Sequence, residues 1–509
     1  MTTVGEVPSS RAHAGAPEFG DVRQLHPVPR RTVALVVAAQ VLLLTALSGR
    51  YGYHRDELYF RVAADHLAWG YVDQPPLTPL LAAVGTAVFG DSLVGLRVIA
   101  TLISAVTVLL VVLIARELGG SGRAQMLAAG CAASSAMVLA LGHMLATATV
   151  DFCLWLLLSW LALRLLRSGD PRWFLPIGVV IGIGVLNKYL ILLLAGGLLV
   201  SLLLVGPRTV LRSPWLVVGA LVAAVIAAPN IAWQAANGWP QLHVAAGIAA
   251  DQGAENRALF VPLQVVYLSP LFIPVWVAGI VRLLRDPESR WARSMVVTYG
   301  LLVVAVVAAG GKAYYVLPLL LVLTAAGTEP VVRAIPSTRT LVAAVGVAAA
   351  VSVAVTLPVL PPSALGPVNA MNAEQGEQVG WPELAETVAE SWALIPAEQR
   401  ADAVIFTINY GQAGALERYG PEWGLPTPYS GHMAYSDWAV PPDDATGPVL
   451  VVADSESRTA ETYFTDCEIV AMNDNGHGLA NDERDTVVRL CRGTVAPWST
   501  LWPQLRRLG

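Results

Sequence analysis

Two adjacent carboxylates, Asp56 and Glu57, lie in a polar and aromatic segment between two long apolar runs, directly after His54 and Arg55. Paired carboxylates suit a reaction in which one group removes a proton from an acceptor nucleophile while its neighbour orients that acceptor or a metal ion. The tyrosines and tryptophans around the pair are also explained by anchoring at a membrane interface, but that role leaves the two acids unexplained. The pair is therefore the first candidate for catalysis.

Basic residues accompany these acids. Lys188, Lys312 and Arg97 each stand at the end of an apolar run, at the level expected for a lipid phosphate. Lysine and arginine neutralise phosphate charge, so these three side chains, together with Arg55, are predicted to hold the phosphate of a lipid-linked donor. The alternative explanation of their position is ordinary snorkelling of a long cationic side chain toward water.

Further polar residues fall on the same predicted face of the membrane. His143 and Asp151 stand at the outer ends of the third and fourth predicted spans, where Asp151 is either a metal or sugar contact or a carboxylate favoured by the helix dipole. The predicted substrate-binding residues are Tyr59, Asp73, Gln74, His143, Asp151, Tyr189, Tyr314 and Tyr315.

Apolar runs of membrane-spanning length must position these residues. Hydrophobic residues make up 55% of the chain and charged residues only 14%, which is more apolar surface than a soluble protein buries. The runs have the roughly 17 to 25 residues needed to cross about 30 Å of hydrocarbon as helices. Eleven spans are predicted, near residues 32–49, 97–115, 124–142, 148–166, 173–187, 189–206, 214–230, 260–283, 294–310, 313–330 and 340–358.

The arginines predict an orientation. Connections rich in arginine alternate along the chain with connections that hold few basic residues, and the former belong in the cytoplasm. With an odd number of spans, the N-terminus is then cytoplasmic, and the 50–96 loop and the C-terminal segment lie outside. The predicted organisation is a disordered cytoplasmic tail at 1–31, a membrane catalytic domain at 32–358 and an extracytoplasmic domain at 359–509, in a multi-pass protein of the cell membrane.

The segment beyond about residue 370 changes character. An amphipathic helix pattern covers 381–395, and short β-branched runs cover 403–406 and 449–452. Alternating helix and strand signals predict a small α/β domain. Cys467 and Cys491 fall in this predicted oxidising location and form either a disulfide or two buried thiols. No catalytic role is assigned to the polar and aromatic residues of this segment, which include Tyr410, Glu417, Tyr429, His432, Tyr435 and Trp438.

Composition and motifs argue against several function classes. The formal net charge of −5 makes nucleic acid an unlikely partner. No Cys/His spacing suggests a zinc site. No Gly-rich loop of the kind that cradles nucleotide phosphates is present, which fits a donor carried on a lipid and used outside the cytoplasm.

The chain resembles the dolichyl-phosphate-mannose protein mannosyltransferase-like superfamily, which includes glycosyltransferase family 39 and bacterial relatives of the aminoarabinose transferase kind. The resemblance covers about residues 32–330, and the ordered set of motifs is fairly specific. The motifs are His54-Arg55-Asp56-Glu57-Leu58-Tyr59, Gly70-Tyr71-Val72-Asp73-Gln74-Pro75-Pro76-Leu77, Leu186-Asn187-Lys188-Tyr189, the stretch from Asn230 to Pro240, and Gly310-Gly311-Lys312-Ala313-Tyr314-Tyr315.

The resemblance implies a membrane all-α GT-C fold, here with an extracytoplasmic α/β domain, and inverting transfer of a sugar from a polyprenyl phosphate. By motif, Asp56 is the general base, Glu57 positions the acceptor or a metal, and Arg97 contacts the donor phosphate. Relatives differ in metal dependence, so a divalent metal cofactor is left open. The chain lacks the lumenal sugar-binding insertion of eukaryotic protein mannosyltransferases, so the acceptor is left as a glycan, a lipid or a protein.

The function hypothesis is therefore a membrane glycosyltransferase that moves a sugar, with mannose as the first choice, from a polyprenyl-phosphate donor in the membrane lipid to an extracytoplasmic acceptor. A transporter or lipid carrier is an alternative, because many spans with a few membrane-level charges also describe solute pathways, although no repeated halves are visible. A non-catalytic envelope glycan sensor is another alternative, and it leaves Asp56 and Glu57 without a role.

Overall fold

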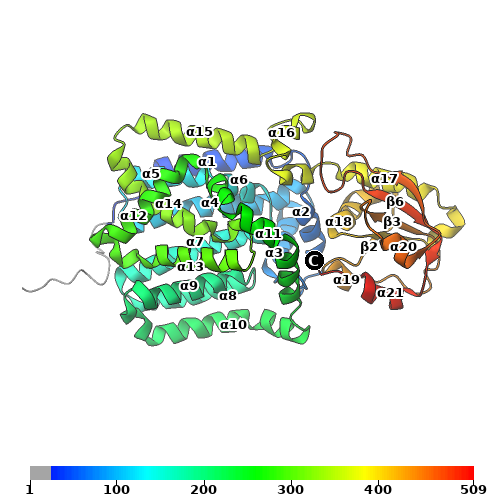
Figure 1. Cartoon of the computed structure of the whole chain (residues 1–509), viewed down its shortest axis with the longest axis horizontal. Helices are drawn as coiled ribbons and strands as arrows, with labels where there is room; N and C mark the ends of the chain where they lie inside the picture. Colours follow the sequence, from blue (N-terminus) through cyan, green and yellow to red (C-terminus); the bar gives the residue numbers. More distant parts are fainter. Residues whose placement is uncertain (1–24, 509) are drawn as a thin grey trace, which may run out of the picture.

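The computed structural model describes residues 25–508 and shows a helical bundle joined end to end with an α/β domain (Figure 1). Most of the predicted tail at 1–31 lies outside the described residues. Helix α1 (Arg30–Leu47) begins at the end of the bundle opposite to the α/β domain. The two sides of the bundle are therefore distinct, with the first span entering from one and the α/β domain attached to the other.

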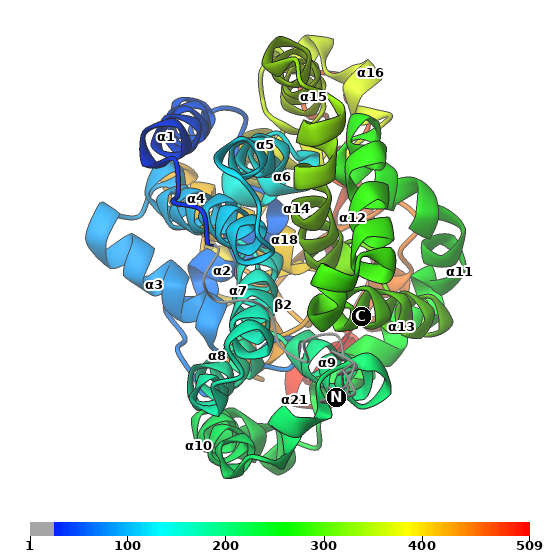
Figure 2. The same ribbon diagram turned by 90° about the vertical axis from the view of Figure 1, so that its left-hand side faces the viewer.

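Long apolar helices run side by side along the bundle and are seen end-on in Figure 2. Among residues 25–508, six helices are long and apolar enough to cross a membrane, or up to eight if two bent pairs each count as one span. Four shorter apolar helices accompany them. The chain is a multi-pass membrane protein.

Besides α1, the bundle contains α4 (Leu93–Glu117), α5 (Gly122–Ala133), α6 (Ala136–His143), α7 (Thr147–Ser168), α8 (Phe174–Val185), α9 (Leu190–Val205), α10 (Pro214–Ala236), α12 (Ile273–Arg285), α13 (Ser294–Ala308), α14 (Leu317–Ala334) and α15 (Thr338–Thr356).

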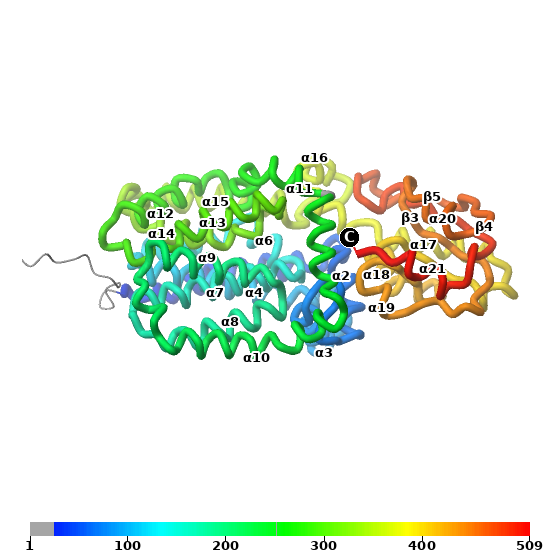
Figure 3. Tube along the Cα trace, turned by 60° about the horizontal axis from the view of Figure 1, so that its bottom comes forward, coloured from blue at the N-terminus to red at the C-terminus, as the bar shows by residue number. Residues whose placement is uncertain are grey.

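Two predicted spans are bent. The predicted span at 124–142 consists of α5 and α6, which meet at 58°. The predicted span at 260–283 crosses an 83° break between α11 (Pro240–Leu268) and α12. The break follows from Ser269, whose φ is 118°, and from Pro270, which has no N–H to continue the helical ladder. Most of α11 crosses the end of the bundle beside the α/β domain (Figure 3).

The predicted loop at 50–96 folds into two helices, α2 (Arg55–Ala63) and α3 (Leu77–Phe89). His54 caps α2: its side chain accepts a hydrogen bond from the Asp56 N–H, and the Glu57 side chain accepts one from the His54 N–H. This reciprocal capping fixes where the helix starts. It also places Asp56 and Glu57 in the first turn, where the helix dipole stabilises carboxylates.

The C-terminal part contains a five-stranded sheet in the order β2-β1-β3-β6-β5. β1 pairs in parallel with β2 and β3, and β6 pairs antiparallel with β3 and β5. A short pair, β4 (Phe464–Thr465) and β7 (Gly493–Thr494), lies beside it. The other elements are α16 (Gly366–Asn369), α17 (Trp381–Ala393), β1 (Val404–Thr407), α18 (Tyr410–Tyr419), β2 (Tyr429–Ser430), α19 (Tyr435–Trp438), β3 (Val449–Ala453), α20 (Thr459–Tyr463), β5 (Glu468–Met472), β6 (Val487–Cys491) and α21 (Trp498–Leu505).

The central strands are covered on both faces. Ile405 and Leu450 belong to a core that includes residues of α17 and α18, whereas Phe406 and Val451 belong to a second core with residues of α21. This alternation follows from the two-residue period of a strand. The first core also contains Leu58 of α2. The α/β domain and the segment that carries Asp56 are therefore parts of one hydrophobic core.

Cys467 and Cys491 form a disulfide across a sequence separation of 24 residues, next to the paired strands β5 and β6. Closing a loop of this length stabilises a fold by about 3 kcal/mol, mainly by restricting the unfolded chain. Replacing both cysteines with serine is expected to lower the thermal unfolding midpoint of the detergent-solubilised chain. Cys153→Ser changes a cysteine that is free in the structure and serves as the control. An equal midpoint for the double variant and the parent would contradict a stabilising disulfide.

Candidate active site

Asp56 lies where the bundle end meets the α/β domain. Its side chain is partly exposed, and its Oδ1 accepts a hydrogen bond of 2.8 Å from the hydroxyl of Tyr410, at the start of α18. Within residues 25–508, no protein hydrogen bond to its second oxygen, Oδ2, is found. Asp56 therefore offers one carboxylate oxygen that is held by protein and one that is free to accept a proton.

Lys188 and Lys312 are the only two lysines of the chain. Both lie at the end of the bundle that faces the α/β domain, and neither forms an ion pair with any carboxylate whose side chain the structure describes. The Lys188 ammonium stands over the rings of Tyr315 and Tyr314, at 4.7 and 5.5 Å from their centroids. Lysines without an acidic partner are suited to an anionic ligand.

Hydrogen bonds fix the turn that carries Lys188. The neighbouring Asn187 is fully buried; its Oδ1 accepts from the Thr78 hydroxyl at 2.7 Å, and its Nδ2 donates to the Thr147 carbonyl at 2.9 Å. The turn is thus tied to the starts of α3 and α7. Asp151, one turn into α7, is buried and within the electrostatic reach of Lys188. The predicted positions around Lys188 therefore do come together.

Lys312 belongs to a second group of charges beside α2. His54 Nε2 donates to Glu374 Oε2 at 2.8 Å, because its Nδ1 already accepts from the Asp56 N–H. This hydrogen bond, helped by the charges of Arg55 and Lys312, lowers the pKa of Glu374 to about 2. Arg55 also reaches the α/β domain, where its Nη1 lies 2.7 Å from Asp482 Oδ2. Glu374 is a participant that no sequence motif indicated.

The Glu57 and Arg97 side chains point into the protein interior, where they contact each other. Both side chains have zero exposure, and Arg97 Nη2 lies 2.7 Å from Glu57 Oε2. Arg97 also donates to the carbonyls of Ser48 and Gly52, and its Nη1 lies 3.0 Å from His143 Nε2. In this structure the three side chains have partners within the protein, and the predicted roles of Glu57 as a catalytic residue, of Arg97 as a contact of the donor phosphate and of His143 as a substrate contact stay predictions. These residues form a buried cluster that fixes α2 against α4 and α6.

Tyr59 and Asp73 form a buried pair near Asp56, and Gln74 follows Asp73 in the chain. The Tyr59 hydroxyl donates to Asp73 Oδ1 at 2.8 Å. Burial raises the pKa of Asp73 to about 7, although the bond from Tyr59 acts in the opposite direction. The Gln74 side chain is buried, and neither its amide nitrogen nor its oxygen has a partner among the described residues. Tyr189 has a structural contact instead, because its hydroxyl donates to Asn230 Oδ1 at 2.6 Å.

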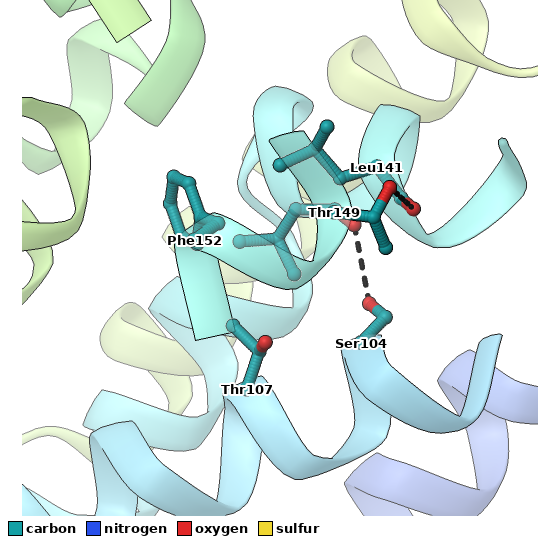
Figure 4. Close-up of a pocket in the computed structure, with 6 residues that line it drawn as sticks. Ser104, Thr107, Leu141, Thr149 and Phe152 are labelled. Carbon is teal, nitrogen blue, oxygen red and sulfur yellow. Dashed lines mark hydrogen bonds between the residues drawn. The ribbon is translucent and has the colours of Figure 1, made fainter. Parts of the chain in front are cut away.

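Two cavities lie deeper in the bundle. The smaller has room for about one water molecule (10 Å³) and is lined by Ser104, Thr107, Val138, Leu141, Thr149 and Phe152 (Figure 4). The larger, of about 340 Å³, is lined almost wholly by apolar residues of α7, α8, α9 and α10; its lining extends from Leu192, one turn beyond Lys188, to Leu211 in the connection between α9 and α10. Neither suits a sugar, the first by size and the second by its apolar lining.

Among the side chains that the structure describes, no group of three or more His, Cys, Asp or Glu is placed to hold a metal ion. Tyr410 has no role predicted from sequence, because nothing in the local pattern of α18 distinguishes a tyrosine that reaches another domain from one that packs within its own. Only the fold brings Tyr410 beside Asp56.

Comparisons with known proteins agree with this architecture. Residues 73–233 match the family described as dolichyl-phosphate-mannose-protein mannosyltransferase. The structure is similar to that of ArnT from Cupriavidus metallidurans in the apo state, with a TM-score of 0.59 and 15% identity over 91% of this chain and 98% of that chain. It is also similar to the same protein bound to undecaprenyl phosphate, with a TM-score of 0.57 and 16% identity over the same shares. No curated protein sequence matches the chain.

These findings confirm the resemblance that the motifs carry. The family match covers less than half of the chain; it includes Asp73 and the Lys188 turn and does not include Asp56 or Lys312. The structural likeness shows a GT-C fold with a C-terminal α/β domain. At this level of identity, the structural likeness establishes the fold and leaves the reaction to be argued from the site.

Proposed function

We propose that this chain is a membrane glycosyltransferase that moves one sugar from a polyprenyl-phosphate carrier to an acceptor hydroxyl outside the cytoplasm. One observation carries the proposal. The only two lysines of the chain lie at the bundle end that holds Asp56, and neither forms a direct ion pair among the described side chains, although Asp151 lies within the electrostatic reach of Lys188 and Glu374 within that of Lys312. A base with a free oxygen beside unpaired cations is what transfer from a lipid phosphate requires.

The reaction is a single displacement at the anomeric carbon. Asp56 Oδ2 takes the proton of the acceptor hydroxyl while the acceptor oxygen forms a bond to that carbon. The bond from the anomeric carbon to the phosphate oxygen breaks, and its electron pair leaves with the carrier phosphate. The phosphate changes from a diester with one negative charge to a monoester with two. Lys188 and Lys312 stabilise that added charge as it develops, and the anomeric configuration inverts.

Other residues have supporting roles in this proposal. Gln74 supplies an amide without a protein partner, which suits hydrogen bonds to a bound sugar. The apolar cavity whose lining extends from Leu192 to Leu211 suits the hydrocarbon tail of the carrier. The solved ArnT structure with undecaprenyl phosphate supports a carrier of this class for a GT-C protein. The arginine-rich connections, such as that between α4 and α5 with Arg116 and Arg123, lie at the opposite end of the bundle and support a site outside the cytoplasm.

A transfer assay tests the proposal. Purified chain in detergent is incubated with a radiolabelled polyprenyl-phosphate sugar and a membrane extract, starting with mannose because of the description of the matching family. Label that moves to a new product, with release of the polyprenyl phosphate, is the expected result. If no sugar in a panel of lipid-linked donors is transferred, but the lipid crosses the membrane of reconstituted vesicles, the carrier alternative is correct.

Lys188→Met is expected to raise the donor KM by roughly 10- to 100-fold, the effect of losing a charged contact worth about 1.5–3 kcal/mol. The two lysines also permit a direct measurement. Polyprenyl phosphate should protect both from an amine-reactive reagent, with the modified sites read by mass spectrometry. Arg212→Met, at the opposite end of the bundle, is the control. A donor KM unchanged by Lys188→Met would show that the phosphate binds elsewhere.

A further inference from the structure

The hydroxyl of Tyr410 connects the α/β domain to the proposed base. It donates to Asp56 Oδ1 at 2.8 Å across a sequence separation of 354 residues. Burial and the nearby charge of Asp56 raise the pKa of Tyr410 well above its usual range, so the phenol keeps its proton and remains a donor. The Tyr410 ring lies between Tyr59 and His432, at centroid distances of 4.8 and 5.0 Å.

Buried hydrogen bonds fix the start of α18. Asn409 caps the helix by accepting from the Gln412 N–H at 2.8 Å. The side chains of Asn409 and Gln412 both donate to Glu483, at 3.1 and 2.8 Å, and the Thr486 hydroxyl donates to the same carboxylate. Glu483 is almost fully buried. The position of Tyr410 is therefore set by the interior of the α/β domain.

Two glycines allow α18 to approach α2 closely. A Cβ added at Gly414 would lie 2.9 Å from the Leu58 Cβ, and one added at Gly411 would lie 3.0 Å from the Arg55 Cβ. Contacts this short leave no room for a methyl group. Gly411 and Gly414 are three residues apart and so share one face of the helix. Their spacing brings α18 near enough to α2 for Tyr410 to reach Asp56.

We infer that Tyr410 is a positioning residue for Asp56 and that the α/β domain is a structural part of the active site. The inference rests on the proposed function of Asp56. A donor fixed on Oδ1 limits rotation of the carboxylate and leaves Oδ2 directed away from Tyr410, toward the acceptor. In this arrangement, the domain completes the site on the side opposite to the membrane.

Tyr410→Phe keeps the ring and removes only the hydroxyl. It is expected to lower kcat roughly 10- to 100-fold with the donor KM nearly unchanged, because orientation of the base is lost and lipid binding is not. Tyr463→Phe, in the same domain next to the other core, is the matched control.

Gly414→Ala tests the same contact from the backbone. The added methyl group must push α18 from α2, so kcat is expected to fall as in Tyr410→Phe. Gly366→Ala is its control, since a Cβ there meets nothing within 4 Å. If Gly414→Ala lowers kcat while Tyr410→Phe keeps the parental kcat and donor KM, the contact is only structural and the inference is overturned. Failure of the parent chain to transfer any sugar would instead overturn the proposed function.

Discussion

Replacing Asp56 with asparagine is expected to reduce sugar transfer by about a thousandfold, which is within the range for loss of a general base. Asparagine cannot take the acceptor proton, but its carbonyl oxygen still accepts the hydrogen bond from Tyr410. The fold and the donor site therefore persist. Transfer is measured with the radiolabelled donor, and donor binding by protection of Lys188 and Lys312 from amine modification.

The control for this substitution is Asp65→Asn, an exposed acid just after α2. It should retain parental activity, because its side chain is directed to solvent. If Asp56→Asn keeps a tenth or more of the parental rate, the base is another group. Asp73 is then the next candidate, since burial already raises the pKa of its carboxyl to about 7 and gives it a higher proton affinity.

The membrane fold was largely accessible from the sequence because span length and hydropathy are set by the bilayer itself. The positions that escaped prediction were bends. Ser134 and Ser135, between α5 and α6, and Ser269 with Pro270, between α11 and α12, interrupt helices inside otherwise continuous apolar runs. An apolar run indicates that a segment lies in lipid or in the protein interior, but it does not indicate the direction in which the helix runs.

The site was accessible in part. Asp56, Lys188 and Lys312 could be singled out because a charge beside an apolar run is costly to bury and has few structural explanations, and their roles in the reaction stay a proposal. Glu57 and Arg97 are also charges beside apolar runs. In the structure they form an ion pair, and this pairing accounts for the burial of both side chains. Their pairing joins residues 40 positions apart, and no local pattern distinguishes it from two separate ligand contacts. Tyr410 was beyond prediction because its partner lies in another domain.

Arg97→Met is expected to destabilise the chain severely. It leaves the Glu57 carboxylate buried without its charge partner, which costs about 3–5 kcal/mol. It also leaves the carbonyls of Ser48 and Gly52 without their donor. The folded yield in detergent and the thermal unfolding midpoint should both fall sharply. Arg61→Met, which breaks the more exposed ion pair with Asp91, is the control and should change the midpoint little.

A second substitution decides between the two accounts of Arg97. Adding Glu57→Gln to Arg97→Met removes the buried charge, while the single glutamine oxygen still accepts from one of the two N–H groups, of His54 or of Leu145, that bond to separate oxygens of Glu57. Part of the lost stability should return, because an unpaired buried charge costs more than an absent pair. If Arg97 instead contacted the donor phosphate, the single variant would fold normally and show a raised donor KM, and the second substitution would restore nothing. The zero exposure of both side chains favours the first result.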